Sequence, residues 1–369
     1  MNGRKVAGRL GKMGWMAVVC GIAGALVAVI IPAGTPAFAQ RPSTGGHVSE
    51  LAAFLDRVQI AEPVVYRHLA VYPVLLSDGP RLRGRWLTLD AALSRGVLEI
   101  TEKGTGGSVP VVVVENRSRD EYVFIMTGEV ISGGKQTRTV RHDVVLAPGQ
   151  RIDLNVFCVE AHRWEGGKAF SSGKLLLPQS IQKELRSGAD QGRVWSEVAR
   201  NNAALAAENR TGSLELALKS APVQDKLGEV RRSIVPRVPQ GTLGFIFVDR
   251  GRALGAELFG SEDMARDLLP KLLDSYAIDC VVILRDEAGV DVRAGNRVAI
   301  DYFERVCRAG SQRADTPGSG AGIRSRSDGL LGDGVSLDGT LVHYGVQVGH
   351  RIVPPPKPHP IIIYPEGRR

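Results

Sequence analysis

Residues 121–164, EYVFIMTGEVISGGKQTRTVRHDVVLAPGQRIDLNVFCVEAHRW, decide the fold of this chain. The stretch holds three runs of apolar and β-branched residues, a composition typical of strands. A glycine-rich segment at residues 128–134 and the dipeptide Pro148-Gly149 separate the runs, and connections this short join antiparallel neighbours. We therefore predict a turn at residues 128–134 and antiparallel strands at residues 121–127, 136–146 and 151–160.

Strand alternation assigns a face to the polar residues of these strands. The apolar side of the third strand ends at Cys158, and Glu160 follows in phase with it. Arg138 falls in phase with the valines of the second strand. An unpaired buried charge is costly, so we predict that Arg138 pairs with Glu160 or Glu129.

The remaining chain predicts further strands and a group of helices after Trp164. Strands are expected at residues 64–76, with an interruption near Pro73, and at 98–101, 109–115, 241–248, 253–259 and 281–284. Helices are expected at residues 178–186, 193–209, 261–276 and 299–308. Pro178 should lie in the first turn of the first of these helices, and Ser261 should cap the third. Pro270 should kink or split the third helix, and Trp195 should join the apolar stripe of the second. The predicted fold class is α+β, an antiparallel β-sheet or sandwich with inserted helices.

We expect a single domain after a signal peptide. Residues 40–59 are predicted to form a loose N-terminal segment, in which residues 48–58 could be a short helix, and residues 60–308 the α+β domain. Residues 309–328 lack apolar periodicity, which predicts a disordered linker. Residues 329–369 should form a hairpin around Asp338-Gly339, followed by a proline-rich tail.

The first 39 residues have the pattern of a secretory signal peptide. Four basic residues precede an apolar run, and Ala37-Phe38-Ala39 offers a small-residue cleavage site. We expect cleavage after Ala39 and export to the periplasm or the extracellular space. An uncleaved membrane anchor stays open, because the apolar run has nearly the length that spans a bilayer.

Charge and cysteine content exclude several classes of protein. The net charge of +8 falls to +4 without residues 1–39, which hold four basic and no acidic residues. No basic cluster forms, so we expect no nucleic-acid partner. Beyond the signal segment the cysteines are Cys158, Cys280 and Cys307, without the spacing of a disulfide framework or a metal site. A Cys280–Cys307 bridge and two buried free thiols both stay open.

The glycine-rich segment is a candidate anion site. Backbone amides freed by glycine can hold an anion, and Lys135 and Arg138 would add positive charge. A nucleoside-triphosphatase loop is excluded, because five residues instead of four separate Gly128 from Gly134-Lys135, and Gln136 takes the place of Ser or Thr. A plain glycine hairpin or bulge is the alternative.

Acidic and nucleophilic side chains of the stretch have both catalytic and structural interpretations. Glu129 or Glu160 could act as a general base, although an ion-pair role is the simpler interpretation. Cys158 lies on an apolar strand face, which favours a core residue over a nucleophile. Trp164 could stack on a ligand or close the end of the sheet. No compact His motif predicts a metal site, and we assign no cofactor.

Two runs resemble a family of domains associated with ADP-ribosylglycohydrolases and with the rhodanese-phosphatase superfamily. The runs are Gly128-Glu129…Gly133-Gly134-Lys135-Gln136-Thr137-Arg138 and Cys158-Val159-Glu160…Arg163-Trp164. The resemblance covers about residues 60–280. It implies no established activity, and at most a ligand related to ADP-ribose or a nucleotide.

Three functions follow as hypotheses. The first is a binding module for a small anionic ligand, lined by Glu129, Lys135, Gln136, Arg138, Arg163 and Trp164 and supported by Glu160. The second is a hydrolase that uses Glu129 or Glu160 as general base. The third is a structural or interaction domain in which the same polar cluster braces the sheet.

Overall fold

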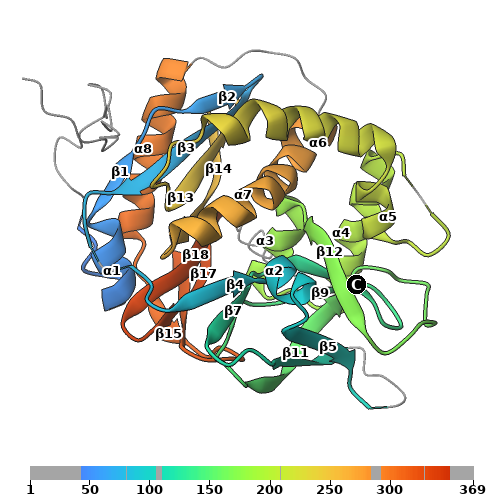
Figure 1. Cartoon of the computed structure of the whole chain (residues 1–369). Coiled ribbons are helices and arrows are strands. Elements are labelled where there is room, and N and C mark those ends of the chain that lie inside the picture. Colours follow the sequence, from blue (N-terminus) through green and yellow to red (C-terminus); the bar gives the residue numbers. More distant parts are fainter. Residues whose placement is uncertain are drawn as a thin grey trace, which may run out of the picture. The chain divides into compact units, whose positions relative to one another are not determined.

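The computed structural model describes residues 43–79, 81–104, 110–207, 209–283, 292–327 and 329–349. The expected signal peptide and the proline-rich tail lie outside these ranges. The described residues belong to one compact unit, built from helices and mostly antiparallel sheets (Figure 1). The fold class is therefore α+β, as predicted. Within the described ranges, no helix has the length and apolar composition needed to cross a bilayer.

The largest sheet is antiparallel and joins both ends of the described chain. Its strands, in spatial order, are β1 (Val58–Ile60), β3 (Leu69–Leu76), β13 (Gly244–Asp249), β14 (Arg252–Phe259), β18 (Thr340–Val348), β17 (Leu330–Leu337), β16 (Ala321–Ser327) and β15 (Gln312–Ala314), with β2 (Val64–Tyr66) paired to β3. The predicted hairpins at residues 241–259 and at Asp338-Gly339 are confirmed. The predicted break near Pro73 is wrong. Pro73 is buried within β3, and the chain breaks instead at Arg67, whose φ is +53°.

The predicted linker is wrong where the structure describes it, because residues 312–314 and 321–327 are strands β15 and β16. In the N-terminal segment, the short helix expected at residues 48–58 is α1 (Ser49–Leu55), and β1 begins at Val58. The guanidinium of Arg313 in β15 pairs with the Glu50 carboxylate of α1 at 2.6 Å. Pairing of β15 with β16 at the edge of the sheet and this ion pair hold both segments in place. Their own apolar periodicity is weak.

A six-stranded antiparallel sheet and a three-stranded sheet share the stretch that decides the fold. The first has the order β12 (Phe170–Leu176), β8 (Glu129–Gly133), β9 (Arg138–Val140), β11 (Arg151–Cys158), β6 (Val111–Asn116) and β5 (Leu98–Glu102). The second has the order β10 (Val144–Leu146), β7 (Glu121–Ile125) and β4 (Arg85–Thr88), with β4 and β7 parallel. Alternate residues of β6 are buried, and the residues between them are partly exposed.

Two predictions within the stretch are wrong. The turn expected at residues 128–134 is mostly strand β8, and the strand expected at residues 136–146 is split into β9 and β10. The split occurs at His142-Asp143. The Asp143 carboxylate accepts hydrogen bonds from the backbone N–H and the hydroxyl of Thr127, both at 2.9 Å. These bonds turn Asp143 away from strand pairing, and alternation alone does not reveal them.

The helices are α1, α2 (Leu89–Ser94), α3 (Gln179–Ser187), α4 (Gln191–Ala204), α5 (Leu214–Leu218), α6 (Ala221–Ile234), α7 (Glu262–Ala277) and α8 (Val292–Arg308). Ser261 caps α7, as predicted, whereas Pro178 is the N-cap residue of α3 and precedes its first turn. Helix α7 runs on through Pro270 without splitting. The strand expected at residues 281–284 is instead part of a π-helix (Ile278–Ile283) as far as residue 283, and residue 284 lies outside the described ranges. Trp195 is exposed, not part of the buried stripe of α4.

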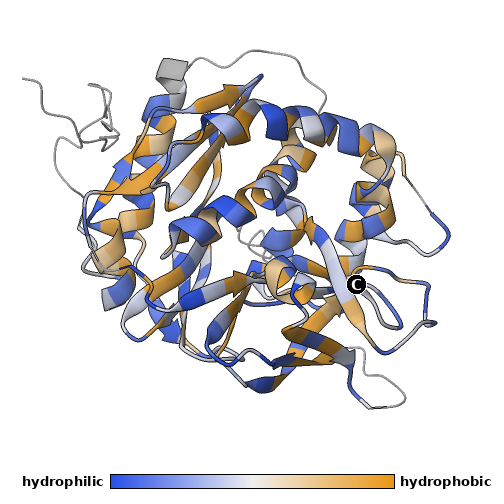
Figure 2. Ribbon diagram, viewed as in Figure 1, coloured by the Kyte–Doolittle hydropathy of each residue, from blue (hydrophilic) through white to orange (hydrophobic). Residues whose placement is uncertain are grey.

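The large sheet is covered by helices on both faces. Phe245 and Phe247 of β13 belong to the apolar cluster of α7, where Phe247 stacks on Tyr276 with ring centroids 3.7 Å apart. The alternate residues of β13 pack with Tyr302 and Phe303 of α8. Figure 2 shows apolar residues gathered on β13 and β14 and hydrophilic residues along α6. Alternate side chains of one strand thus enter two separate cores.

Candidate functional site

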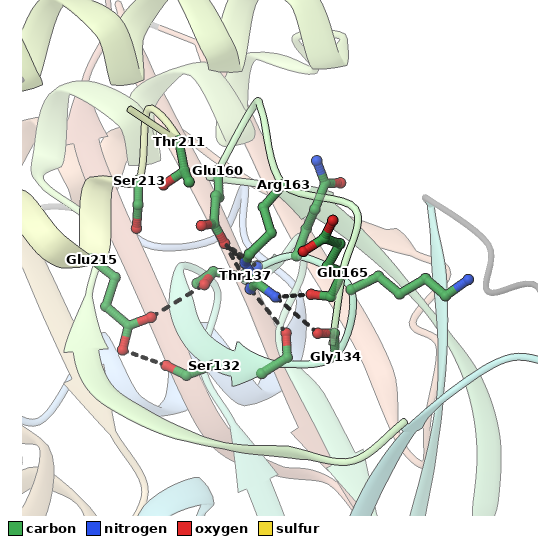
Figure 3. Close-up of polar contacts among 12 residues, drawn as sticks. Ser132, Gly134, Thr137, Glu160, Arg163, Glu165, Thr211, Ser213 and Glu215 are labelled. Atoms are coloured by element: carbon green, nitrogen blue, oxygen red, sulfur yellow. Dashed lines mark hydrogen bonds and ion pairs between the residues drawn. The ribbon is translucent and has the colours of Figure 1, made fainter. Parts of the chain in front are cut away.

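The two sequence motifs meet at the end of the six-stranded sheet (Figure 3). Cys158 of β11 lies opposite Arg138 of β9 in the antiparallel register. Beyond β11 the chain turns back, and the Glu160 carboxylate accepts a hydrogen bond from the backbone N–H of Thr137 at 3.1 Å. The second motif is therefore held directly against the first.

Arg163 ties the glycine pair to the second motif. Its guanidinium donates to the carbonyl oxygens of Gly134 at 3.0 Å, Gly133 at 3.4 Å and Glu165 at 2.5 Å. Its Nη2 also lies 2.7 Å from Glu160 Oε2. All of these partners belong to the chain itself, so in this conformation Arg163 holds the loop in place.

The surroundings of Glu160 keep its carboxylate anionic. Burial alone would raise its pKa, but hydrogen bonds from Arg163, Thr137 and Thr211 outweigh burial and lower the pKa below its ordinary value. A carboxylate stabilised in this way is a weaker base. The geometry therefore favours a structural role for Glu160.

The prediction that Arg138 pairs with Glu160 or Glu129 is wrong. Arg138 is fully buried, its Nη1 donates to Gln136 Oε1 at 3.0 Å, and its Nη2 lies 3.7 Å from Glu102 Oε1. Glu160 is occupied by Arg163, and Glu129 lies in a separate ion-pair cluster. Sequence reasoning missed Glu102, although alternation from Leu98 and Ile100 points it inward at the end of β5.

Lys135 and Trp164 cover this buried guanidinium from the solvent side. The Trp164 ring is 43% exposed, and its centroid lies 5.2 Å from Lys135 Nζ and 5.7 Å from Arg138 Cζ. The backbone N–H of Lys135 donates to Glu102 Oε1 at 2.8 Å. The Gln136 amide, which accepts from Arg138, also reaches the carbonyl of Ala161 at 3.4 Å.

Glu129 does not join these residues. It is fully buried in β8, accepts from the backbone N–H of Met126 at 2.8 Å and forms an ion pair with Lys271 of α7. Lys271 Nζ also lies 3.0 Å from Asp90 Oδ2. Burial raises the pKa of Glu129, against the opposing effect of Lys271. Sequence reasoning missed Lys271 and Asp90, which come from helices far away in the chain.

The carboxylate of Glu215, on helix α5, lies beside the first motif, as does that of Glu160 (Figure 3). Glu215 accepts from the Ser132 hydroxyl at 2.6 Å and from the Thr137 hydroxyl at 3.2 Å, and it pairs with Lys219 at 2.5 Å. These bonds hold α5 against β8 and the start of β9.

Cys158 has the surroundings of a core residue. Its side chain is buried, and burial raises the pKa of its thiol to about 11, so the thiol is protonated near neutral pH. Cys280 and Cys307 are also buried, and both are free thiols rather than a bridge. Among the described residues, no group of three His, Cys, Asp or Glu side chains is arranged to hold a metal ion.

A buried charge network lies below the predicted site and was missed by sequence reasoning. His343 of β18 lies between Asp143, with Nδ1 to Oδ2 at 2.6 Å, and Glu257, with Nε2 to Oε2 at 3.1 Å. Glu257 also faces Arg186 Nη2 at 3.3 Å and accepts from the hydroxyl of Tyr276 at 3.1 Å. Asp143 is therefore an ion-pair partner of His343.

Two cavities open away from the motif residues. One, of about 560 Å³, is lined by His142, Asn155, Arg313, Asp315 and Arg324 among others. The other, of about 790 Å³, lies between the segment before β4 and the turn between β17 and β18. Neither contains Lys135, Arg138 or Trp164, so a ligand at the motif residues would contact the surface at Trp164 or require that ring to move.

Comparison with known proteins finds one family. The sequence profile of the ARG and Rhodanese-Phosphatase-superfamily-associated Protein domain matches residues 57–346, well over half of the chain. The match extends through strands β15 to β17 and most of β18. Neither the curated proteins nor the solved structures contain a match to this chain.

Proposed function

The chain belongs to the family of the ARG and Rhodanese-Phosphatase-superfamily-associated Protein domain, and from this membership we propose that it binds a small anionic ligand where its two motifs meet. The site would be formed by Lys135, Arg138 and Trp164. Gln136, Glu160 and Arg163 would hold these residues in position.

The proposal rests on the burial and the hydrogen bonding of the Arg138 side chain. Its side chain is fully buried, yet its Nε and Nη2 atoms have no hydrogen-bond partner among the described residues. A buried donor without an acceptor costs about 1–3 kcal/mol, and more when it is charged. Among the described residues, the carboxylate that pairs with Arg138 is that of Glu102, at 3.7 Å. An anionic oxygen would supply the missing acceptor.

Trp164 is placed to control access to this guanidinium. Its half-exposed ring lies over both Lys135 and Arg138, held by contacts of 5.2 and 5.7 Å with the two cations. Cation–π contacts at exposed sites contribute only about 0.5–1 kcal/mol. An anion can therefore displace the ring from Arg138 at small cost, while Lys135 adds a second positive charge.

We infer that the ligand is a phosphate or a phosphorylated compound. A planar guanidinium beside an ammonium group suits phosphate oxygens. The family name links these domains to ADP-ribosylglycohydrolases and phosphatases, so ADP-ribose and simple nucleotides are the first ligands to test. The signal-like residues 1–39 support a location outside the cytoplasm, and this belongs to the proposal.

The contacts of the two motif carboxylates favour binding over hydrolysis. Glu129 is buried in an ion pair with Lys271, and a hydrogen bond from Arg163 keeps Glu160 anionic. A general base needs both access to the substrate and a raised proton affinity; Glu129 lacks the first, and Glu160 lacks the second. The bracing role is the stronger competitor, because Arg163 and Gln136 bond only to the chain itself.

A thermal-shift titration of the full chain with phosphate, AMP and ADP-ribose tests the proposal. A ligand at a hundredfold its dissociation constant should stabilise the fold by about 2.7 kcal/mol. Lys135→Ala and Trp164→Ala should remove the shift given by inorganic phosphate and leave the unliganded melting temperature nearly unchanged. Lys226→Ala and Trp195→Ala, on helices α6 and α4, are the matched controls and should retain the shift.

The same variants separate binding from bracing. If no compound shifts the melting temperature and Arg138→Ala lowers stability by about 3–5 kcal/mol, the cluster is a brace and the binding proposal is wrong. A shift given by inorganic phosphate that survives in Lys135→Ala and Trp164→Ala would also overturn the proposed site.

A further inference from the structure

The cavity of about 790 Å³ beside β4 has the composition of a second ligand site, independent of the motif residues. Its volume falls within the range of about 300–1,000 Å³ typical of small-molecule pockets. One wall is the segment that leads into β4, with Arg81 and Arg83, and the opposite wall is the turn that joins β17 to β18. We propose that this cavity binds a small phosphorylated molecule that carries a planar aromatic ring, a class that includes nucleoside monophosphates.

The two arginines supply the charge for a phosphate group. Arg81 and Arg83 are exposed, both line the cavity, and neither lies within ion-pair distance of a carboxylate in the part of the chain that the structure describes. Their neighbour Arg85 differs, because Asp120 lies 2.9 Å from its guanidinium and Glu121 lies 3.1 Å from it. Two guanidinium groups on one wall of a cavity favour a group with two negative charges.

An aromatic pair forms the floor beside these charges. Trp86 of β4 and Tyr122 of β7 are adjacent in the parallel register and stack with centroids 4.9 Å apart and an interplanar angle of 20°. The indole N–H of Trp86 donates to the carbonyl of Arg83 at 2.9 Å, which fixes the ring relative to the arginine segment. Both rings line the cavity and remain partly exposed, so a planar ligand ring can stack there.

Gly84 leaves space between the two aromatic rings and the two arginines of the cavity. Gly84 has a φ of +86°, and a Cβ at this position would lie 3.7 Å from the Tyr122 ring. A larger residue would be strained and would narrow the cavity. Asp338 and Thr340 also line the cavity, and their side chains can form hydrogen bonds with ligand hydroxyl groups. The lining thus combines groups suited to a phosphate, to a planar ring and to hydroxyl groups.

Calorimetric titration of the full chain with AMP, phenyl phosphate, adenosine and inorganic phosphate tests this assignment. AMP and phenyl phosphate should bind, while adenosine and inorganic phosphate, which each lack one half of the ligand, should bind at least about tenfold more weakly. The double variant R81A/R83A should lose about tenfold or more in AMP affinity. Trp86→Leu should weaken AMP by about tenfold and leave the affinity for inorganic phosphate unchanged.

The control double variant R232A/R252A removes two exposed arginines of α6 and β14 and should bind AMP as the native chain does. No binding of AMP or phenyl phosphate by the native chain would overturn the assignment. So would full AMP affinity in R81A/R83A, whose exposed side chains can be removed without unfolding the chain.

Lys135→Ala and Trp164→Ala distinguish this cavity from the proposed motif site. They should leave AMP affinity at the cavity unchanged. If these two variants abolish AMP binding and R81A/R83A does not, the cavity assignment is wrong and the motif site is supported.

Discussion

The Nδ1 atom of His343 lies 2.6 Å from Oδ2 of Asp143, although 200 positions separate the two residues in the sequence. Both are buried, and Glu257 approaches the other imidazole nitrogen at 3.1 Å. Burial alone would lower the pKa of His343, but Asp143 and Glu257 outweigh burial and raise the pKa to about 9. The pair joins the loop between β9 and β10 to a central strand of the large sheet.

This pair predicts a loss of stability on the alkaline side of neutrality. Because the pKa of His343 in the folded chain lies above the ordinary value of 6.5, the folded state binds the proton more tightly. The pair contributes fully below about pH 6.5, and its contribution disappears as the pH rises through about 9. We expect urea unfolding to show a decrease on the order of 3 kcal/mol over this interval.

His343→Gln should flatten that alkaline decrease and lower stability at pH 6. His162→Gln, at an exposed position, is the matched control and should leave the slope unchanged. An equal alkaline decrease in His343→Gln and in the native chain would show that other groups cause it. On the acid side, hydrogen bonds from Thr127 and the charge of His343 outweigh burial and lower the pKa of Asp143, so its contribution is lost only below about pH 4.

The Glu129–Lys271 ion pair predicts a strong effect of removing one partner. Lys271→Met leaves the fully buried Glu129 carboxylate without its cation. Breaking a buried pair in this way typically costs about 3–5 kcal/mol, and we expect that loss in urea unfolding at pH 7. Lys219→Met breaks the exposed Lys219–Glu215 pair as a control and should cost under about 1 kcal/mol.

The double variant Glu129→Gln/Lys271→Met removes both charges and should recover most of the lost stability. A loss in Lys271→Met no larger than that in Lys219→Met would mean that the pair does not stabilise the fold. A double variant as unstable as Lys271→Met would attribute the loss to packing of α7 instead of charge.

Local patterns were sufficient for elements whose signals lie within a few residues. The hairpin at Asp338-Gly339, the Ser261 cap and the apolar side of β11 were all predicted correctly. Each depends on turn chemistry or on alternation along one strand. The family resemblance likewise depended on two compact motifs.

The wrong predictions depend on partners far away in the sequence. The strand expected at residues 136–146 is broken by the contacts of Asp143 with Thr127 and His343. Residues 309–328 have weak periodicity, yet β16 pairs with β17 along its whole length. In the motif site, alternation placed Arg138 inward, but it could not decide which of several inward carboxylates would face it. Two strands, β11 and β6, lie between Glu102 and Arg138 in the sheet, and Glu102 comes 36 positions earlier in the sequence.

Gly134 of the first motif and Gly149 of the turn before β11 both have a positive φ, but we predict that alanine costs more stability at Gly134 than at Gly149. Gly134 has a φ of +53°, and a Cβ there would lie 2.1 Å from Phe170 Cζ and 2.8 Å from Glu102 Oε1. Gly149 has a φ of +73°, and nothing lies within 4 Å of a Cβ at that position. Gly149→Ala should therefore cost only the conformational strain, about 1 kcal/mol. Gly134→Ala adds overpacking and should cost about 2–4 kcal/mol in urea unfolding.

Replacing Phe170 with a smaller residue tests whether crowding against its ring causes the larger cost of Gly134→Ala. In a Phe170→Leu background, Gly134→Ala should cost less than in the native chain, because the closest atom is removed. Equal costs for Gly134→Ala and Gly149→Ala would mean that Phe170 moves aside freely. The glycine at position 134 would then serve the backbone approach of a ligand and not the packing of the sheet end against Phe170.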